Sequence, residues 1–208
     1  MADRNITDIT DHLIHPAVRD QVRKLYVDSI EMADPLTRES IIDSYIDNTR
    51  SLRTFAYMDD GKVLGFSIVG HLGEDQYDLL EAFLSCDRDK MNSYLKTDYE
   101  DRSPSLKSDN TDPVIEFSDR VYLAGTLISL DEALIKYVTV VSPEHRRKGI
   151  AKRLNYFINR SFNRPIFSTC VEDNPMIHIN KKAGYTHLGS IKPFYADGKG
   201  AVILGRFR

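Results

Sequence analysis

Apolar residues recur at helical spacing in the first part of the chain, after Pro16. They stand at Val18, Val22, Leu25, Tyr26 and Ile30. This spacing places them on one face of a helix, and proline fits a first helical turn, so the pattern predicts a helix over 16–30. A second helix is predicted over 37–48, with Thr37 as its N-cap. Its apolar face consists of Ile41, Ile42, Tyr45 and Ile46.

The period of the pattern changes close to residue 50. Residues 52–58 and 62–71 are rich in β-branched and aromatic side chains, which favour strands. Asp59, Asp60 and Gly61 separate the two runs, and an Asp-Gly pair is a signal for a tight turn. The sequence therefore predicts a β-hairpin in this region.

Short apolar runs alternate with helical patterns in the last third of the chain. Strands are predicted over 121–129, 133–141, 166–170, 186–191 and 201–207. One helix is predicted to begin near Gly149, after a turn at 142–148. Another begins after Asn174, a good N-cap that precedes Pro175, and ends at Gly184. Strands that alternate with helices indicate an α/β fold in which helices flank a mixed central sheet.

Composition narrows the class of protein. The chain has 208 residues, of which 41% are hydrophobic and 28% are charged, values typical of a soluble globular domain. A formal net charge of −3 argues against a general electrostatic nucleic-acid binder, which carries a basic excess. No apolar run approaches the ~20 residues that span a bilayer, and the first residues lack the apolar core of a signal peptide. Two cysteines fit a reducing compartment, so we expect a cytoplasmic protein.

Residues 74–120 differ from the rest and are interpreted as an insertion in a single domain that spans 1–208. We expect a helix over 75–84 and an irregular loop over 99–113, which contains two prolines. The insertion carries 13 acidic and 6 basic residues, a net charge of −7, so the remainder has a net charge of +4. Two interpretations stay open: the acidic segment binds a cationic substrate, or its charge only keeps a loop in solvent.

The strand, turn and helix over 139–154 form the pattern with the most chemical content. Arg146 to Ala151 follow the pattern Arg/Gln-x-x-Gly-x-Gly/Ala. The start of a helix offers unpaired N–H groups and the positive end of the helix dipole. Gly149 and the small Ala151 let a ligand approach the backbone, and basic side chains surround them. These features predict a site for a pyrophosphate or a similar anion, although a solvated basic turn has the same composition.

Two sequence blocks resemble motifs of the GNAT acetyltransferase superfamily. Residues 141–151, VSPEHRRKGIA, are similar to the acyl-CoA pyrophosphate loop of that family. Residues 174–185, NPMIHINKKAGY, resemble the motif that follows it in the family order. The resemblance covers the chain from 133 to 190. It implies a GNAT fold, in which helices flank a mixed sheet, and an acetyl-CoA-dependent N-acetyltransferase activity.

The resemblance implies a role for each matching residue of the strand and the loop. Backbone groups of Thr139, Val140 and Val141 would pair with the pantetheine arm of acetyl-CoA, and an N–H there would polarise the thioester carbonyl. Arg146 occupies the Arg/Gln position of the motif. Backbone N–H groups of the residues after it would hold the pyrophosphate. These residues are Arg147, Lys148, Gly149, Ile150 and Ala151.

The second motif carries over with one departure. Asn174 matches an asparagine that lies against the cofactor arm in the family, and Asn180 and Lys181 are expected to approach the cofactor from the same helix. Many family members have a tyrosine about seven residues after the motif asparagine, and this tyrosine acts as general acid. This chain has Asn180 and Lys181 there instead. Other acids or bases in the sequence are Glu132, Glu172, Tyr137, Cys170 and Tyr195. For each of them a solvated or packed role is favoured over a catalytic one, so the catalytic residues stay unknown.

The sequence thus predicts an enzyme that transfers an acetyl group from acetyl-CoA to a primary amine of a small molecule or peptide. No metal is expected, because His12 and His15 lack further ligands. No nucleic-acid or membrane partner is expected. The expected oligomeric state is a monomer or a homodimer. The missing tyrosine keeps a second hypothesis open: a catalytically weak acyl-CoA-binding module, acting as a sensor or in protein interactions. A third hypothesis is a protein of the same fold that uses another acyl donor.

Overall fold

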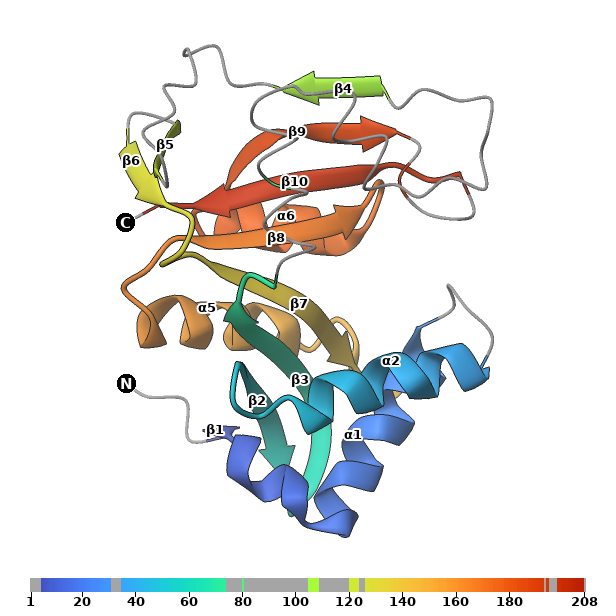
Figure 1. The fold of residues 1–208 in the computed structure, drawn as a ribbon. Coiled ribbons are helices and arrows are strands. Elements are labelled where there is room, and N and C mark those ends of the chain that lie inside the picture. The colour runs from blue at the N-terminus through green and yellow to red at the C-terminus, as the bar shows by residue number, and fades with distance from the viewer. Residues whose placement is uncertain are drawn as a thin grey trace. The chain divides into compact units, whose positions relative to one another are not determined.

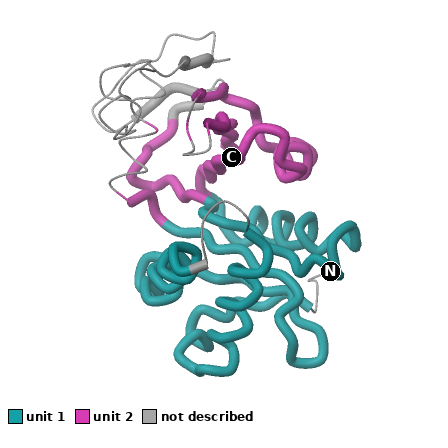
Figure 2. The backbone as a smooth tube through the Cα atoms, turned by 90° about the vertical axis from the view of Figure 1, so that its right-hand side faces the viewer, with its two compact units in different colours: residues 1–70, 136–163 teal, residues 71–135, 164–208 magenta. Residues whose placement is uncertain are grey.

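The computed structural model of the chain describes residues 5–30, 35–73, 80, 105–108, 120–123, 126–192, 194 and 198–207. The chain divides into two compact units, which Figure 2 colours separately. Unit 1 comprises Met1–Gly70 and Lys136–Asn163, and unit 2 comprises His71–Ile135 and Arg164–Arg208. Each unit contains strands and helices, so the predicted α/β class is confirmed.

The strands of unit 1 follow the order β1-β2-β3-β7. Their bounds are β1 Ile6–Asp8, β2 Leu52–Asp59, β3 Lys62–His71 and β7 Leu134–Val141 (Figure 1). β2 and β3 form the predicted hairpin, in which Leu52 pairs with Gly70. Asp60 and Gly61 at its tip have φ values of +46° and +75°, as a type I′ turn requires.

Three α-helices belong to unit 1, namely α1 Pro16–Ser29, α2 Pro35–Asp47 and α5 Ile150–Ser161. α1 confirms the helix predicted from the apolar spacing. α2 begins two residues before the predicted N-cap Thr37, because proline at position 35 fits the first helical turn, where its missing N–H is no loss. The sequence pattern does not predict β1 or the 3-10 turn η1, Thr10–Ile14, since each is too short to show a period.

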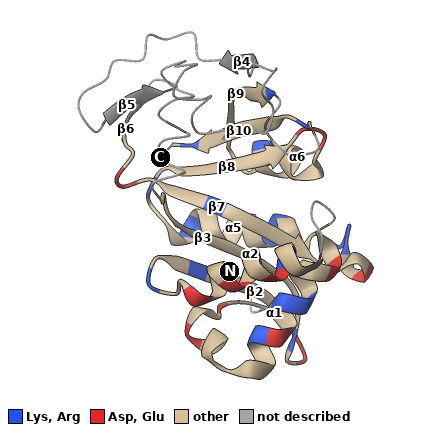
Figure 3. Ribbon diagram, turned by 45° about the vertical axis from the view of Figure 1, so that its right-hand side comes forward, with Lys and Arg blue, Asp and Glu red and all other residues tan. Residues whose placement is uncertain are grey.

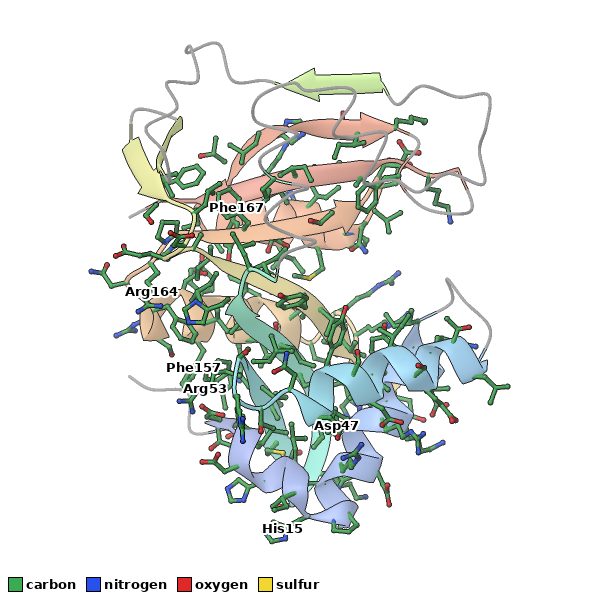
Figure 4. The ribbon with its side chains drawn as sticks, viewed as in Figure 1. His15, Asp47, Arg53, Phe157, Arg164 and Phe167 are labelled. Carbon is green, nitrogen blue, oxygen red and sulfur yellow. The ribbon has the colours of Figure 1, made fainter. Side chains whose placement is uncertain are left out.

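Helices cover both faces of the unit 1 strands. Residues of α1 and α2 pack on one face in a core that includes Val22, Leu25, Ile42, Ile46, Leu52, Ala56 and Phe66. Side chains alternate along β2, so Phe55 points to the opposite face. There its ring centroid lies 5.6 Å from that of Phe157, which Figure 4 labels on α5. α5 is therefore held against the sheet by aromatic packing.

Ion pairs join α1 to α2 on the solvent side. Arg19 lies 2.7 Å from Asp47, and Arg23 lies 2.7 Å from Asp43. Arg23 also approaches Glu39, at 3.3 Å. Figure 3 shows both signs of charge interspersed along these two helices. Because the side chains are partly exposed, each pair contributes little free energy, and their effect is to align the helices.

Unit 2 contains a second group of strands in the order β8-β10-β9-β4. Their bounds are β8 Ile166–Val171, β10 Ala201–Arg206, β9 Thr186–Lys192 and β4 Ser105–Ser108. The pairs within it are antiparallel, and the register shifts between Ile203 and Leu204. Helix α6, Pro175–Lys182, completes the unit. Its buried apolar residues include Ile166, Phe167, Leu188, Ile191, Ile203 and Leu204.

Two of the predicted elements differ from the structure. The single strand expected over 121–129 is a hairpin of β5, Arg120–Leu123, and β6, Thr126–Ser129. The two residues between these strands, 124 and 125, lie outside the described residues. Within the loop expected over 99–113, β4 pairs with β9, because an extended polar segment can complete a sheet edge without an apolar pattern. The helix expected over 75–84 and the rest of that loop lie outside the described residues, Leu80 excepted.

Tyr185 makes the stability of the protein depend on pH in alkaline solution. Its side chain is buried, and burial raises the pKa of its phenol above the usual 10.0, while nearby Arg206 partly opposes the rise. The unfolded chain therefore loses this proton near pH 10, and the folded chain keeps it. We expect the free energy of unfolding to fall by about 1.4 kcal/mol per pH unit above pH 10 from this group.

Urea unfolding at a series of alkaline pH values measures this slope. The variant Y185F lacks the ionisable group and should show a shallower decline, with a remainder from Tyr26, whose pKa burial also raises. An equally steep decline in Y185F would contradict the assignment.

Candidate functional site

A tight loop joins β7 to α5 in unit 1. The N–H of Ser142 donates to the carbonyl of Leu64 in β3 at 2.9 Å, which fixes the start of the loop. The 3-10 turn η2, Pro143–His145, follows. A Cβ atom at Gly65 would lie 2.9 Å from Cγ2 of Ile150 and 2.9 Å from the carbonyl of Val140. Glycine at this position thus lets β3 approach both the end of β7 and the first residue of α5.

Two residues of the loop have a left-handed backbone. The φ angle is +64° at Arg147 and +82° at Gly149. Positive φ is uncommon for a residue other than glycine, and such conformations concentrate at functional sites. Alternation of right- and left-handed residues is also how successive N–H groups come to form a concave anion site. The left-handed backbone at Arg147 and Gly149 is compatible with such a site, and phosphate binding by the loop stays a prediction.

The backbone at Gly149 is open. A Cβ atom there would meet nothing within 4 Å, so space is present where a ligand would approach. Gly149 is also the N-cap of α5, and as a glycine it has no side chain to bind the first N–H groups of that helix. These donors, at the positive end of the helix dipole, are suited to a phosphate group. The predicted residues Arg147, Lys148, Gly149, Ile150 and Ala151 are brought together in this turn.

Basic side chains surround the loop. Arg146, Arg147 and Lys148 are exposed, and the first turn of α5 contains no acidic residue. On α5 itself, Lys152 lies over the ring of Tyr156, and Arg153 donates to the hydroxyl of Tyr57 at 3.3 Å. Glu144 in η2 is also exposed, but the three neighbouring cations outnumber it, which favours an anion at the open backbone.

The predicted strand residues lie at the end of β7, next to the loop. Val140 is buried in the core of unit 1, whereas Thr139 and Val141 are half-buried. The hydroxyl of Thr139 lies 2.9 Å from that of Ser67 in β3, and Ser67 also donates to the carbonyl of Val138. These side chains pin β7 to β3. The pairing of β7 backbone groups with a cofactor arm stays a prediction.

In unit 2, Asn174 and Asn180 have different surroundings. Asn174 is exposed and caps α6 as predicted: its Oδ1 accepts from the N–H of Met176 at 2.8 Å. Asn180 is 0% exposed, and its amide donates to Ser168 at 3.3 Å and to the sulfur of Cys170 at 3.6 Å. This burial does not support a direct cofactor contact by the Asn180 side chain, because the amide is already engaged inside the unit.

Substitutions at Asn174 separate its capping role from a cofactor role. N174A should lose about 1 kcal/mol of stability, because it removes the cap of α6. N174S keeps a capping oxygen and loses only the amide, so its melting temperature should stay close to that of the wild type. If the amide also contacts a cofactor, N174S will bind CoA more weakly at unchanged stability. Equal CoA affinity in N174S would limit Asn174 to capping.

The surroundings of the candidate acids and bases do not favour any one of them as a catalytic residue. Glu132 is exposed in a turn of unit 2, and Glu172 forms an ion pair of 3.1 Å with Lys192. In unit 1 the ring of Tyr137 packs on Tyr45, with centroids 5.5 Å apart. Cys170 is buried. Tyr195 lies outside the described residues.

Two further features concern ligands and membranes. Within the part of the chain that the structure describes, no three histidine, cysteine or acidic side chains come together as a metal site. His12 and His15 stack at 6.3 Å between ring centroids, and both are exposed. Over the same residues, no helix has the length and apolar content needed to cross a membrane.

Comparison with solved structures decides the fold. No protein-family model matches the chain, and no curated protein matches it. A GNAT-family acetyltransferase structure from Desulfovibrio desulfuricans superposes with a TM-score of 0.55, covering 96% of each chain at 12% identity. The chain has the GNAT fold. This confirms the fold that the two sequence motifs imply.

Other GNAT-fold structures differ in chemistry. An aminoglycoside 6′-acetyltransferase type Ii gives a TM-score of 0.57 at 13% identity, covering 97% of this chain and 96% of that one. A GNAT-like decarboxylase in complex with isobutyryl-CoA gives 0.58 at 11% identity, covering 97% of this chain and 98% of that one. The GNAT fold of this chain is thus shared by proteins of more than one activity.

Proposed function

We propose that the protein is an acetyl-CoA-dependent N-acetyltransferase that binds the cofactor pyrophosphate at the loop between β7 and α5. The observation that carries the proposal is the conformation of this loop, with left-handed backbone at Arg147 and Gly149 and open space at Gly149. Its uncapped N–H groups and exposed cations suit a pyrophosphate. Similarity to GNAT-fold acetyltransferases supports the same assignment.

Each part of the loop has a distinct task in this proposal. Backbone N–H groups from Arg147 to Ala151 bind the phosphate oxygens, and Lys148 supplies long-range attraction. Backbone groups of Thr139, Val140 and Val141 orient the pantetheine arm, as an added strand would be oriented. A contact between the Asn174 amide and the cofactor arm stays a prediction, which the N174S variant tests. Bound acetyl-CoA supplies an acyl group activated as a thioester.

The proposed acceptor is a primary amine of a small molecule or peptide. Such an amine has a pKa near 10.4 and is almost fully protonated at neutral pH, so a base or a water must remove a proton before attack. We assign no residue to this step. The net charge of −7 in 74–120 favours a cationic acceptor. Removal of that segment should then raise the KM for cationic acceptors; unchanged acceptor kinetics would refute this part.

Thermal unfolding with acetyl-CoA, CoA and ATP tests the cofactor. At 100 times Kd, a ligand adds about 2.7 kcal/mol, which for a chain of this size raises the melting temperature by about 5–10 °C. We expect the rise with acetyl-CoA and CoA but not with ATP. No rise with either CoA species would overturn the proposal.

Thiol release across a panel of amines then tests transfer. A second candidate, an acyl-CoA-binding module without transfer, is favoured by one observation: a buried asparagine, Asn180, and an exposed lysine stand where many family members have the acid tyrosine. Cofactor binding without thiol release from any amine would select this second candidate. Competition between acetyl-CoA and other acyl-CoAs for binding shows whether the protein uses a different acyl donor.

A further inference from the structure

Helix α1 ends without a basic residue of its own. The last carbonyls of a helix have no partner within the helix, and they lie at the negative end of its dipole. The last turn of α1 contains no lysine or arginine that could bind them. The carbonyls at this end are therefore acceptors for donors from elsewhere in unit 1.

Two guanidinium groups supply these donors. Arg38, from α2, donates to the carbonyl of Val27 at 2.6 Å and to the carbonyl of Ile30. Arg146, from the loop between β7 and α5, donates through Nη2 to the carbonyl of Ser29 at 3.4 Å. The two arginines come from different elements and meet the same helix end. A cationic donor at a helix C-terminus is stabilising by both hydrogen bonding and charge.

Arg146 also holds its own loop. Its Nε donates to the carbonyl of Val141, the last residue of β7, at 3.4 Å. One side chain thus joins the end of β7, the loop and the end of α1, although Ser29 lies 117 positions away in the sequence. All three cations of the loop, Arg146, Arg147 and Lys148, are exposed, but the Arg146 guanidinium is directed to carbonyl oxygens of the protein.

We propose that Arg146 is a positioning residue that couples the anion-binding loop to the C-terminal end of α1, and that it does not act as a phosphate ligand. The link between the loop and α1 does not depend on the proposed function. Only the part of the proposal that concerns the cofactor rests on it. Because coupling is reciprocal, a ligand that orders the loop also orders the last turn of α1. Cofactor occupancy is thereby transmitted to the helix pair α1 and α2.

Hydrogen exchange of the protein without ligand tests the link by itself. R146M should accelerate exchange at the amide of Ile30, which donates to Tyr26 in the last turn of α1, and at the amide of Ser142 in the loop. R38M, the matched control, should accelerate exchange at Ile30 alone. R147M should change neither. Unchanged exchange at Ile30 in R146M would overturn the link whether or not the protein binds CoA.

CoA titration at several salt concentrations tests the positioning role. R146M should weaken CoA binding roughly fivefold, the low end of coupling between sites, and leave the salt dependence as in the wild type. R147M should weaken binding with a flatter salt dependence, because it removes a charge near the phosphates. R146K, which keeps a donor of nearly equal length, should recover part of the loss. A flatter salt dependence in R146M would make Arg146 a phosphate ligand.

Failure of the proposed function and failure of the coupling give different results. If the wild type fails to bind CoA, the proposed function fails and the exchange experiment still decides the link. If CoA binds and protects the amide of Ile30 in the wild type but not in R146M, the coupling is established. Protection of the Ile30 amide by CoA in both the wild type and R146M would refute the coupling.

Discussion

G149V should lose CoA affinity by roughly 10- to 100-fold, equal to about 1.4–2.8 kcal/mol. Gly149 has a φ of +82°, which a β-branched residue adopts only under strain. The added side chain would also enter the open space at the start of α5, where the phosphates are proposed to bind. Both effects act on the same backbone donors, so this is the largest change in binding that we expect from one substitution.

Gly61 provides a matched control for G149V. It has a similar φ, +75°, and a Cβ atom there would also meet nothing within 4 Å. G61V should therefore lose comparable stability, about 1–3 kcal/mol, and bind CoA as the wild type does. Calorimetric titration well below both melting temperatures separates the two effects. Wild-type CoA affinity in G149V would show that the cofactor binds elsewhere.

N155L should cause the largest loss of stability among the substitutions considered. Lys136 on β7 is 4% exposed, and its ammonium donates to Oδ1 of Asn155 on α5 at 2.9 Å. Leucine would leave the ammonium buried without this acceptor. Because a hydrogen bond to a charged group is worth about 1.5–3 kcal/mol and the buried ammonium loses this acceptor, we expect a decrease within that range.

A double-mutant cycle checks the origin of this effect. K136M/N155L should recover part of the loss, because no buried charge remains. K152M changes an exposed lysine of the same helix and should change the free energy of unfolding by less than about 0.5 kcal/mol. If N155L and the double variant are equally unstable, the loss comes from packing and not from the ammonium.

The bond between Lys136 and Asn155 also matters for the site. It fixes α5 to β7, the two elements joined by the loop that we propose binds an anion. Gly65 allows β3 to lie against both. β7, α5 and β3 therefore hold one another where the loop begins and ends, which supports the left-handed residues of the loop.

The sequence by itself determined the elements whose signals are local. The helix α1, the hairpin with Asp60 and Gly61, and the Asn174 cap follow from spacing and capping chemistry within a few residues. The loop motif at 146–151 is of the same kind, since glycine spacing and neighbouring charge are read directly from adjacent positions. Such signals are strong because helical period, tight turns and caps each depend on residues close in sequence.

Only the tertiary structure decided which of these residues is buried and what each contacts. Asn180 looks like a cofactor residue in its motif, yet its amide is enclosed with Ser168 and Cys170. The bonds from Arg146 to Ser29 and from Lys136 to Asn155 link residues of different elements, and no local pattern encodes them. The physical reason is that burial and long-range hydrogen bonds are set by how whole elements pack, whereas the sequence pattern reports the shape of each element alone.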